Sequence, residues 1–438
     1  MGKSTNIYEY HFERTSQHPT PEDLKRLIFS YDKSASEALH RLVGPQERGH
    51  RDLYTLVAEY RKTDSVVGEL WIEITTIPEW VNWDQIERGQ KIFWRYGGAS
   101  ITALVYLSLL GGMGSGRTVE TLDRTGGFDA AVVRRRLLET AQHTLGVHKD
   151  LVSLQPGGEG FLASVRVRLL HASVRNRIMQ LAKTEPAYYS IEDYGIPIND
   201  LDCIGTICIF STMMIWMGWP RQGIYLRQQE ILDYLALWRY VAYLLGTPND
   251  WLSSPESARK MMESILESEI KPTKKSKTLA QNIITGLEGV PPMFASRSYQ
   301  NALAHWLNGS TLATELGIEK PSFWYKFLTA GQCLLFALDG YIKRSVSSWD
   351  ERNVKFTRRI IYAALIYDKS KGALGYKAKF PFKWIPDLVR TTTPLGKTSE
   401  ANIKSSGIFS PGAERVAFIT LLVFGLMIGC TFYILSWI

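Results

Sequence analysis

Apolar residues recur every three or four positions along most of this chain, which is the spacing of one buried face of an α-helix. The pattern dominates from about residue 80 to residue 245, where Pro197, Pro220 and Pro248 punctuate it. There is no internal repeat and almost no strand-like alternation of apolar and polar residues. The sequence therefore predicts a mainly α-helical protein.

Changes in this pattern divide the chain into four parts. Residues 1–78 mix charged and aromatic residues with helical spacing and predict a peripheral helical region. Residues 79–373 carry the helices of one large domain. Residues 374–414 are rich in Lys, Pro, Thr and Ser and predict a linker, whose basic aromatic sequence FPFKWIP suits a membrane surface. Residues 415–438 predict a C-terminal transmembrane helix.

The predicted span runs from Val416 to Ile438 without a charged residue, long enough to cross a hydrocarbon core of roughly 30 Å. Arg415, Lys404 and Lys397 precede it, so the positive-inside rule places the body of the protein in the cytosol. A buried core helix is the alternative, but a uniformly apolar helix would have no polar face. The N-terminus has no apolar signal segment. We therefore expect a tail anchor.

Composition limits the classes of partner. With 45% apolar residues in 438, the chain can bury a large core. Its net charge of +8 is spread along the sequence, which argues against a nucleic-acid partner and is compatible with anionic lipid or an acidic cofactor. The four cysteines form no Cys-x-x-Cys pair, so neither a zinc site nor a disulfide framework is predicted.

The segment from 164 to 178, SVRVRLLHASVRNRI, places one histidine between two arginines on a helical face. Arg168 and Arg175 lie about one turn before and one turn after His171, which falls at the edge of an apolar stripe. Two cations around one imidazole suit a buried anionic cofactor with a metal centre, and haem is the first candidate. The alternative is a structural histidine at the edge of the core beside a solvated basic face.

A second group lies on the preceding helix. Arg136, Glu139, Thr140 and His143 are spaced so that all four share one face. A carboxylate, a hydroxyl and an imidazole grouped in this way can manage protons beside a bound oxygen species. An ordinary polar helix face with an Arg136–Glu139 ion pair is the alternative.

Three other motifs give weaker indications of a functional site. The glycines of Gly112–Gly116 lack the lysine and the strand of a phosphate loop, and are expected to allow a tight turn or the approach of a flat ligand. Phe327–Cys333 lacks the arginine and glycine that flank the cysteine of haem-thiolate oxygenases. A non-haem iron site at Glu139 and His143 would need another histidine, and His148 follows Gly146, where the helix is expected to end.

Several features follow one another in a recognisable order: a glycine-rich turn, Glu120, Arg136-x-x-x-Thr140, Arg168-x-x-His171-x-x-x-Arg175 and the segment GIPINDLDCIGTICIFS. This order resembles the latex-clearing protein (rubber oxygenase) family, and the pattern is most similar to its fungal branch of mpaB-type, ER-bound oxygenases. The resemblance covers roughly Trp80 to Gly246.

The resemblance implies a b-type haem protein with globin-like core helices around a haem pocket, which uses O2 to cleave isoprenoid C=C bonds. By position, His171 is the axial iron ligand, and Arg168 and Arg175 support the cofactor and the fold. Glu120 is the catalytic acid or base, with a pKa that burial is expected to raise.

The resemblance also implies that Arg136 and Thr140 are catalytic, on the helix over the opposite haem face. Two departures matter. Glu139 stands beside the cofactor where the family can have a lysine, and Asn176 stands where the family has a histidine. These departures argue against a lysine-capped iron and against rubber as the substrate. The tail anchor favours a smaller prenyl chain dissolved in the membrane, so the predicted substrate is a prenylated or terpenoid metabolite. Hydroxylation, oxidative rearrangement, or a non-catalytic membrane-tethered protein are the alternatives.

Overall fold

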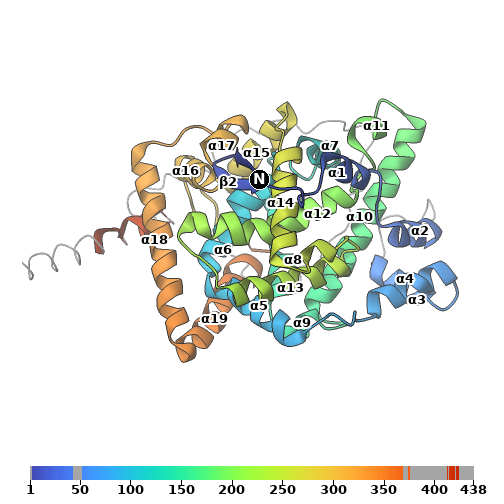
Figure 1. Cartoon of the computed structure of the whole chain (residues 1–438), viewed down its shortest axis with the longest axis horizontal. Coiled ribbons are helices and arrows are strands. Elements are labelled where there is room, and N and C mark those ends of the chain that lie inside the picture. The colour runs from blue at the N-terminus through green and yellow to red at the C-terminus, as the bar shows by residue number, and fades with distance from the viewer. Residues whose placement is uncertain are drawn as a thin grey trace, which may run out of the picture.

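The computed structural model describes residues 2–42, 52–367, 373–374, 412, 414–419 and 421–423, and it confirms the mainly helical architecture (Figure 1). The strands within these residues form one antiparallel hairpin near the N-terminus, β1 (Lys3–Ile7) and β2 (Tyr10–Arg14). The prediction of a purely helical region for residues 1–78 was therefore wrong at its start. Tyr8 and Glu9 adopt positive φ between the strands, the backbone that a tight hairpin turn needs.

Four helices follow the hairpin, and they are α1 (Pro21–Leu27), α2 (Lys33–Leu42), α3 (Leu53–Tyr60) and α4 (Ser65–Thr75). Side-chain caps begin all four, and at α2 the cap is Asp32, which accepts from the Ala35 amide at 3.2 Å. Thr20 and Asp23 form a reciprocal capping box at α1, and Asp52 and Asp64 accept hydrogen bonds from the first amides of α3 and α4. These helices lie at one end of the molecule, at the right of Figure 1, where α2 and α3 pack on α10 (Glu159–Thr184).

The centre of the core is the pair α5 (Trp83–Arg95) and α13 (Gln228–Leu244), which make the most extensive helix–helix contact in the described structure. Gly89 allows this contact, because a methyl group there would lie 2.4 Å from the carbonyl oxygen of Asp233. Beside Gly89, the side chains of Ile86 and Phe93 are buried against the core. Ile86, Gly89 and Phe93 are spaced along one face of α5, and this is the face that packs on α13.

The remaining elements surround this pair. In the first half of the chain they are α6 (Gly97–Ala103), the π-helix η1 (Leu104–Leu110), α7 (Gly116–Thr125), α8 (Val133–His148), α9 (Leu151–Leu154), α11 (Ile191–Tyr194) and α12 (Asp200–Phe210). In the second half they are η2 (Met214–Gly218), η3 (Pro220–Gln222), η4 (Asp250–Leu252), α14 (Pro255–Glu269), α15 (Lys274–Leu287), α16 (Arg297–Asn308), α17 (Ser310–Glu315), α18 (Phe323–Ser345), α19 (Ser347–Tyr362) and η5 (Ala363–Tyr367).

Helices α8 and α10 carry most of the candidate residues and pack against each other. The expected helix end at Gly146 was wrong, because α8 continues to His148. Here Gly160 is the glycine that the packing requires, because a methyl group on it would lie 2.7 Å from the carbonyl oxygen of Gly146, whereas one on Gly146 would make ordinary contact at 3.6 Å from the Cα atom of Gly160. The two glycines bring the C-terminal end of α8 close to the start of α10.

The glycines of 112–116 likewise serve backbone contact. Ser115 pairs with Ile270 in an isolated β-bridge, and a methyl group on Gly116 would lie 2.6 Å from the carbonyl oxygen of Lys271. The close approach predicted for these glycines is thus made, at Gly116, to another part of the chain.

By length and composition, one helical stretch in the described residues could cross a membrane, and it is Asp200–Gly218. Most of it is buried inside the protein, as in the core helix of a globular domain. The predicted span Val416–Ile438 lies largely outside the described residues, of which 414–419 and 421–423 are helical.

His148 predicts how stability responds to pH. It is fully buried, its ring stacks on Phe93 with 4.0 Å between centroids, and burial lowers its pKa to about 3. Because the unfolded histidine titrates near its ordinary value of 6.5, acid favours the unfolded state as pH falls below that value. Between pH 7 and pH 5, His148 should remove about 2 kcal/mol from the free energy of unfolding.

Urea unfolding at the two pH values measures this loss. A His148→Asn variant, although less stable at pH 7, should lose about 2 kcal/mol less than the wild type over the same interval. Equal losses in the two proteins would show that His148 is not held neutral.

Candidate functional site

His171 lies on α10 in surroundings that keep its ring neutral. Burial, together with the nearby Arg175 and His143, lowers its pKa to about 4. The residue nevertheless keeps part of its surface accessible, and within the described structure its ring makes no hydrogen bond. Together these features fit a neutral imidazole with a free lone pair. That is the form in which histidine binds a metal.

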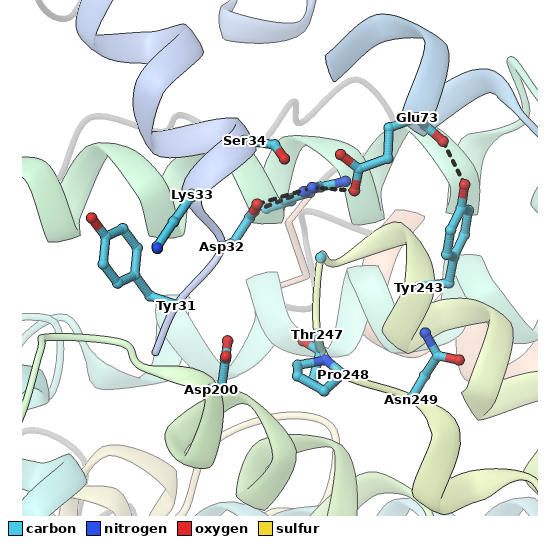
Figure 2. Close-up of a pocket in the computed structure, with 12 residues that line it drawn as sticks. Tyr31, Asp32, Lys33, Ser34, Glu73, Asp200, Tyr243, Thr247, Pro248 and Asn249 are labelled. Carbon is cyan, nitrogen blue, oxygen red and sulfur yellow. Dashed lines mark hydrogen bonds and ion pairs between the residues drawn. The ribbon is translucent and has the colours of Figure 1, made fainter. Parts of the chain in front are cut away.

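Arg168, one turn before His171, is held by two carboxylates (Figure 2). Its guanidinium donates to both oxygens of Asp32, at 2.7 and 2.9 Å, and to Glu73 at 2.7 Å. Burial opposes the charge of Arg168, but the two carboxylates outweigh it and raise the pKa of the guanidinium. The interaction ties α10 to the start of α2 and to α4.

Arg175, one turn after His171, is held mainly by backbone. It donates to the carbonyl oxygen of Ile198 at 2.7 Å and to the Ser36 hydroxyl at 2.8 Å, and its guanidinium lies 5.1 Å from the centroid of the Tyr31 ring. Asn176 donates to the carbonyl oxygen of Ser36 at 2.8 Å. The structure thus shows that Arg168 and Arg175 brace α10. Direct contact of either one with a cofactor stays a prediction.

Arg168 also lines a surface cleft of about 260 Å³. Asp32 and Glu73, which both accept from Arg168, lie close together in this cleft in Figure 2, and Asp200, Lys33 and Tyr243 also line it. The Tyr243 hydroxyl donates to the backbone carbonyl of Glu73 at 2.6 Å. The cleft therefore exposes the outer side of the ion-pair network that fixes α10.

On α8, Arg136 and Glu139 form the ion pair that the sequence left open as the simpler alternative. Glu139 is buried and accepts from Arg136 at 2.8 Å and from Arg135 at 3.1 Å. The Thr140 hydroxyl donates to the carbonyl oxygen of Arg136 at 3.1 Å. Burial lowers the pKa of Arg136.

His143 completes this face and lies close enough to His171 to influence its pKa. Its Nε2 is 3.0 Å from the hydroxyl oxygen of Ser164, which donates its own hydrogen to the carbonyl oxygen of Gly160 at 2.8 Å. Nε2 of His143 must therefore be the donor, which leaves Nδ1 as the bare nitrogen of the neutral ring. Burial lowers the pKa of His143 to about 4. Sequence spacing grouped His143 with this face but could not assign its tautomer.

Glu120, on α7, is not the raised-pKa acid that burial suggested. It accepts from Lys275 and from Arg124, each at 2.7 Å. Burial acts to raise the pKa of Glu120, but these two cations outweigh it and the pKa is lowered. The expectation failed because Lys275 starts α15, 155 residues further along the chain, and sequence spacing gives no sign of this contact.

Within the described structure, no three side chains of His, Cys, Asp or Glu cluster as metal ligands. A haem iron takes four ligands from the porphyrin nitrogens and needs only an axial ligand from the protein. The neutral, unpartnered imidazole of His171 fits that demand.

Comparison with known proteins identifies the family. Residues 94–331 match the family model described as the catalytic domain of "ER-bound oxygenase mpaB/B'/Rubber oxygenase". The chain belongs to this family. The match covers α6 to the middle of α18, and so includes every candidate site residue named above. The predicted resemblance is thereby confirmed.

Two known proteins are similar to this chain. It is 21% identical to the rubber oxygenase of Streptomyces sp. (strain K30) over 271 residues, which are 60% of this chain and 62% of that protein. It also superimposes on the structure of latex clearing protein in the closed state, with a TM-score of 0.59 and 17% identity, over 82% of this chain and 95% of that one. The second likeness shows that the two proteins share a fold.

The ion pairs of Arg168 predict that replacing Asp32 lowers the free energy of unfolding more than replacing Glu73 does. Asp32→Asn keeps a side-chain oxygen that can cap α2, but it removes the negative charge that neutralises the buried guanidinium of Arg168. The free energy of unfolding should therefore fall by about 3 kcal/mol. Glu73 is more exposed. Glu73→Gln should therefore cost less than about 1 kcal/mol. Urea unfolding of both variants measures the difference, and equal costs would contradict the assignment of Asp32 as the main brace.

Proposed function

We propose that this protein is a membrane-anchored, haem-dependent oxygenase that uses O2 to cleave a C=C bond in the isoprenoid chain of a specialised metabolite. The observation that carries the proposal is His171: a neutral, unpartnered imidazole, enclosed by protein, on a helix braced on both sides. Membership of the mpaB/rubber oxygenase family supports it.

In this proposal His171 holds the iron of haem b, and the haem supplies the oxygen chemistry. The chain's own contribution is to keep the ring in place and unprotonated. Arg168 and Arg175 fix the helix, and the charge of Arg175 disfavours a proton on His171. We further propose that both arginines support the cofactor, as the family pattern implies.

Arg136 and Thr140 on α8 are the proposed catalytic residues that face the reacting double bond. Glu139, beside the proposed cofactor, is held by two arginines and so has little freedom to bind iron in place of the lysine of related proteins. Because its pKa is lowered, Glu120 starts as a carboxylate. It is therefore suited to accept a proton from the substrate, and not to donate one.

The proposed substrate is a prenylated or terpenoid small molecule. Two residues support this choice over rubber: Glu139 and Asn176 occupy positions where the family can have a lysine and a histidine, and both are engaged by protein contacts. We also propose that Val416–Ile438 anchors the protein in the ER membrane with its body in the cytosol. Such an anchor would bring the site close to membrane-dissolved prenyl chains.

Haem binding through His171 has a spectroscopic test. Purified protein should show the Soret absorption of a b-type haem, and His171→Ala should lose most of it because the axial ligand is gone. His40→Ala, an exposed histidine on α2, is the control and should keep the band. Wild-type protein without any Soret band after reconstitution with haem would remove the proposal and favour a non-catalytic role.

The reaction has a separate test. With a farnesylated aromatic compound and isotopically labelled O2, the holoenzyme should release two carbonyl fragments. Each fragment should carry one labelled oxygen atom, because both atoms of O2 are consumed when one C=C bond becomes two C=O bonds. Mass spectrometry of the products decides the outcome. An uncleaved hydroxylated or rearranged product would replace cleavage with the alternative oxygenase reactions.

A further inference from the structure

Helices α18 and α19 form a hairpin along one side of the molecule, at the left of Figure 1. Its inner face packs on α5 and α6. A methyl group on Gly340 would lie 2.6 Å from the Tyr96 ring, and one on Gly98 would lie 2.5 Å from the ring of Phe336. The hairpin is therefore fixed to the core, and its outer face points away from it.

That outer face is unusually apolar. Of the 23 large apolar side chains exposed in the described structure, fifteen lie on α18, α19, the residues that follow them, and the described part of the C-terminal helix. They are Phe323, Trp324, Phe327, Leu338, Ile342, Val346, Trp349, Phe356, Ile360, Tyr367, Val416, Phe418, Ile419, Leu422 and Val423. Single exposed apolar residues are normal on a protein surface, whereas a grouped set marks an interaction site. We call this set the outer face.

The spacing shows that these side chains share a direction. On α18, Phe323, Phe327, Leu338 and Ile342 are separated by four, eleven and four residues, which are whole turns of a helix. On α19, Phe356 and Ile360 are four residues apart. Each helix therefore presents a continuous apolar stripe.

The same region is basic. Residues 320–367 contain eight lysines and arginines and three acidic residues, a net charge of +5 out of +8 for the whole chain. Exposed Lys355, Arg352 and Arg359 lie among the apolar side chains of α19, and Trp324 and Trp349 bring aromatic rings that favour a membrane interface. An apolar stripe with basic neighbours matches the headgroup region of an anionic bilayer.

The C-terminal segment starts on the outer face. A methyl group on Gly331 would lie 2.4 Å from the side chain of Leu421, and the rings of Phe418 and Trp324 are 5.6 Å apart. The uncharged sequence Val416–Ile438 therefore begins its course against α18. If this sequence enters a bilayer, the outer face must lie next to the same bilayer.

We propose that the outer face is a membrane-docking surface, which inserts its apolar side chains among the headgroups of an anionic bilayer beside the tail anchor. The inference builds on the anchoring in the proposed function and is independent of haem and of catalysis. It makes the protein attach to the membrane at two places, by one spanning segment and by one broad surface.

Site-directed spin labelling tests the insertion. Nitroxide labels are attached to two full-length variants, Phe323→Cys and Phe356→Cys. The matched control is Ile72→Cys, on α4 at the opposite end of the molecule (Figure 1). Phe356 and Ile72 are both 64% exposed. Cys430→Ser is included throughout, and burial raises the pKa of Cys203, Cys208 and Cys333 to about 12, which keeps these thiols protonated and slow to react.

Each variant is reconstituted into vesicles of phosphatidylcholine and phosphatidylserine. Labels at 323 and 356 should collide several-fold more often with O2 and less often with a water-soluble nickel complex than the label at 72. The difference should shrink in phosphatidylcholine alone. Labels at 323 and 356 that are as accessible to nickel as the label at 72 would overturn the proposal. Labels shielded from both reagents would also overturn it, because another protein segment or a second copy would then cover the face.

Extraction of the same vesicles with alkaline carbonate reports the anchor separately. Protein that stays in the membrane with water-exposed labels would contradict the docking surface alone. Protein that carbonate releases, although its labels were inserted beforehand, would contradict the anchor alone.

Discussion

The position of His171 depends on the two buried arginines that fasten α10. Arg168 binds carboxylates from the N-terminal helices, and Arg175 binds the chain at residues 197–198, so the helix is held one turn before the histidine and one turn after it. The second arginine also repels a proton from the ring. One pair of cations thus fixes both the place and the ionisation state of the imidazole, the two properties that a metal ligand must have.

The family resemblance assigned a role to Glu120, and the contacts in the structure change its expected ionisation and add His143 to the site. Glu120 is neutralised by Lys275 and Arg124, so its environment favours an anion. His143, which no family motif singled out, lies beside His171 as a neutral ring with Nδ1 bare. Between these two groups the protein offers one permanent carboxylate and one uncharged base. The two groups differ as proton acceptors. Removing a neutral imidazole from water costs less free energy than removing a carboxylate.

Local patterns predicted what local forces determine. The helical periodicity gave the mainly helical fold, and the i, i+3, i+4 spacing correctly grouped Arg136 with Glu139. What the sequence could not predict depends on distant contacts: Asp32, which braces Arg168, is 136 residues from it, and Lys275, which lowers the pKa of Glu120, is 155 residues from Glu120. The end of α8 was also misplaced, because the helix continues through Gly146 to His148, where α8 packs closely against Gly160 at the start of α10. The hairpin of β1 and β2 was missed since five-residue strands carry little periodic signal.

Gly331 has a mechanical consequence. Because it lacks a side chain, Leu421 sits directly against α18, only a few residues into the uncharged C-terminal segment. There is consequently little slack between the globular body and the point at which the chain would enter a bilayer. A body joined so closely cannot swing freely, and its tilt relative to the membrane plane is restricted. The direction from which a lipid-dissolved molecule reaches α8 and α10 would then be a fixed property of the protein.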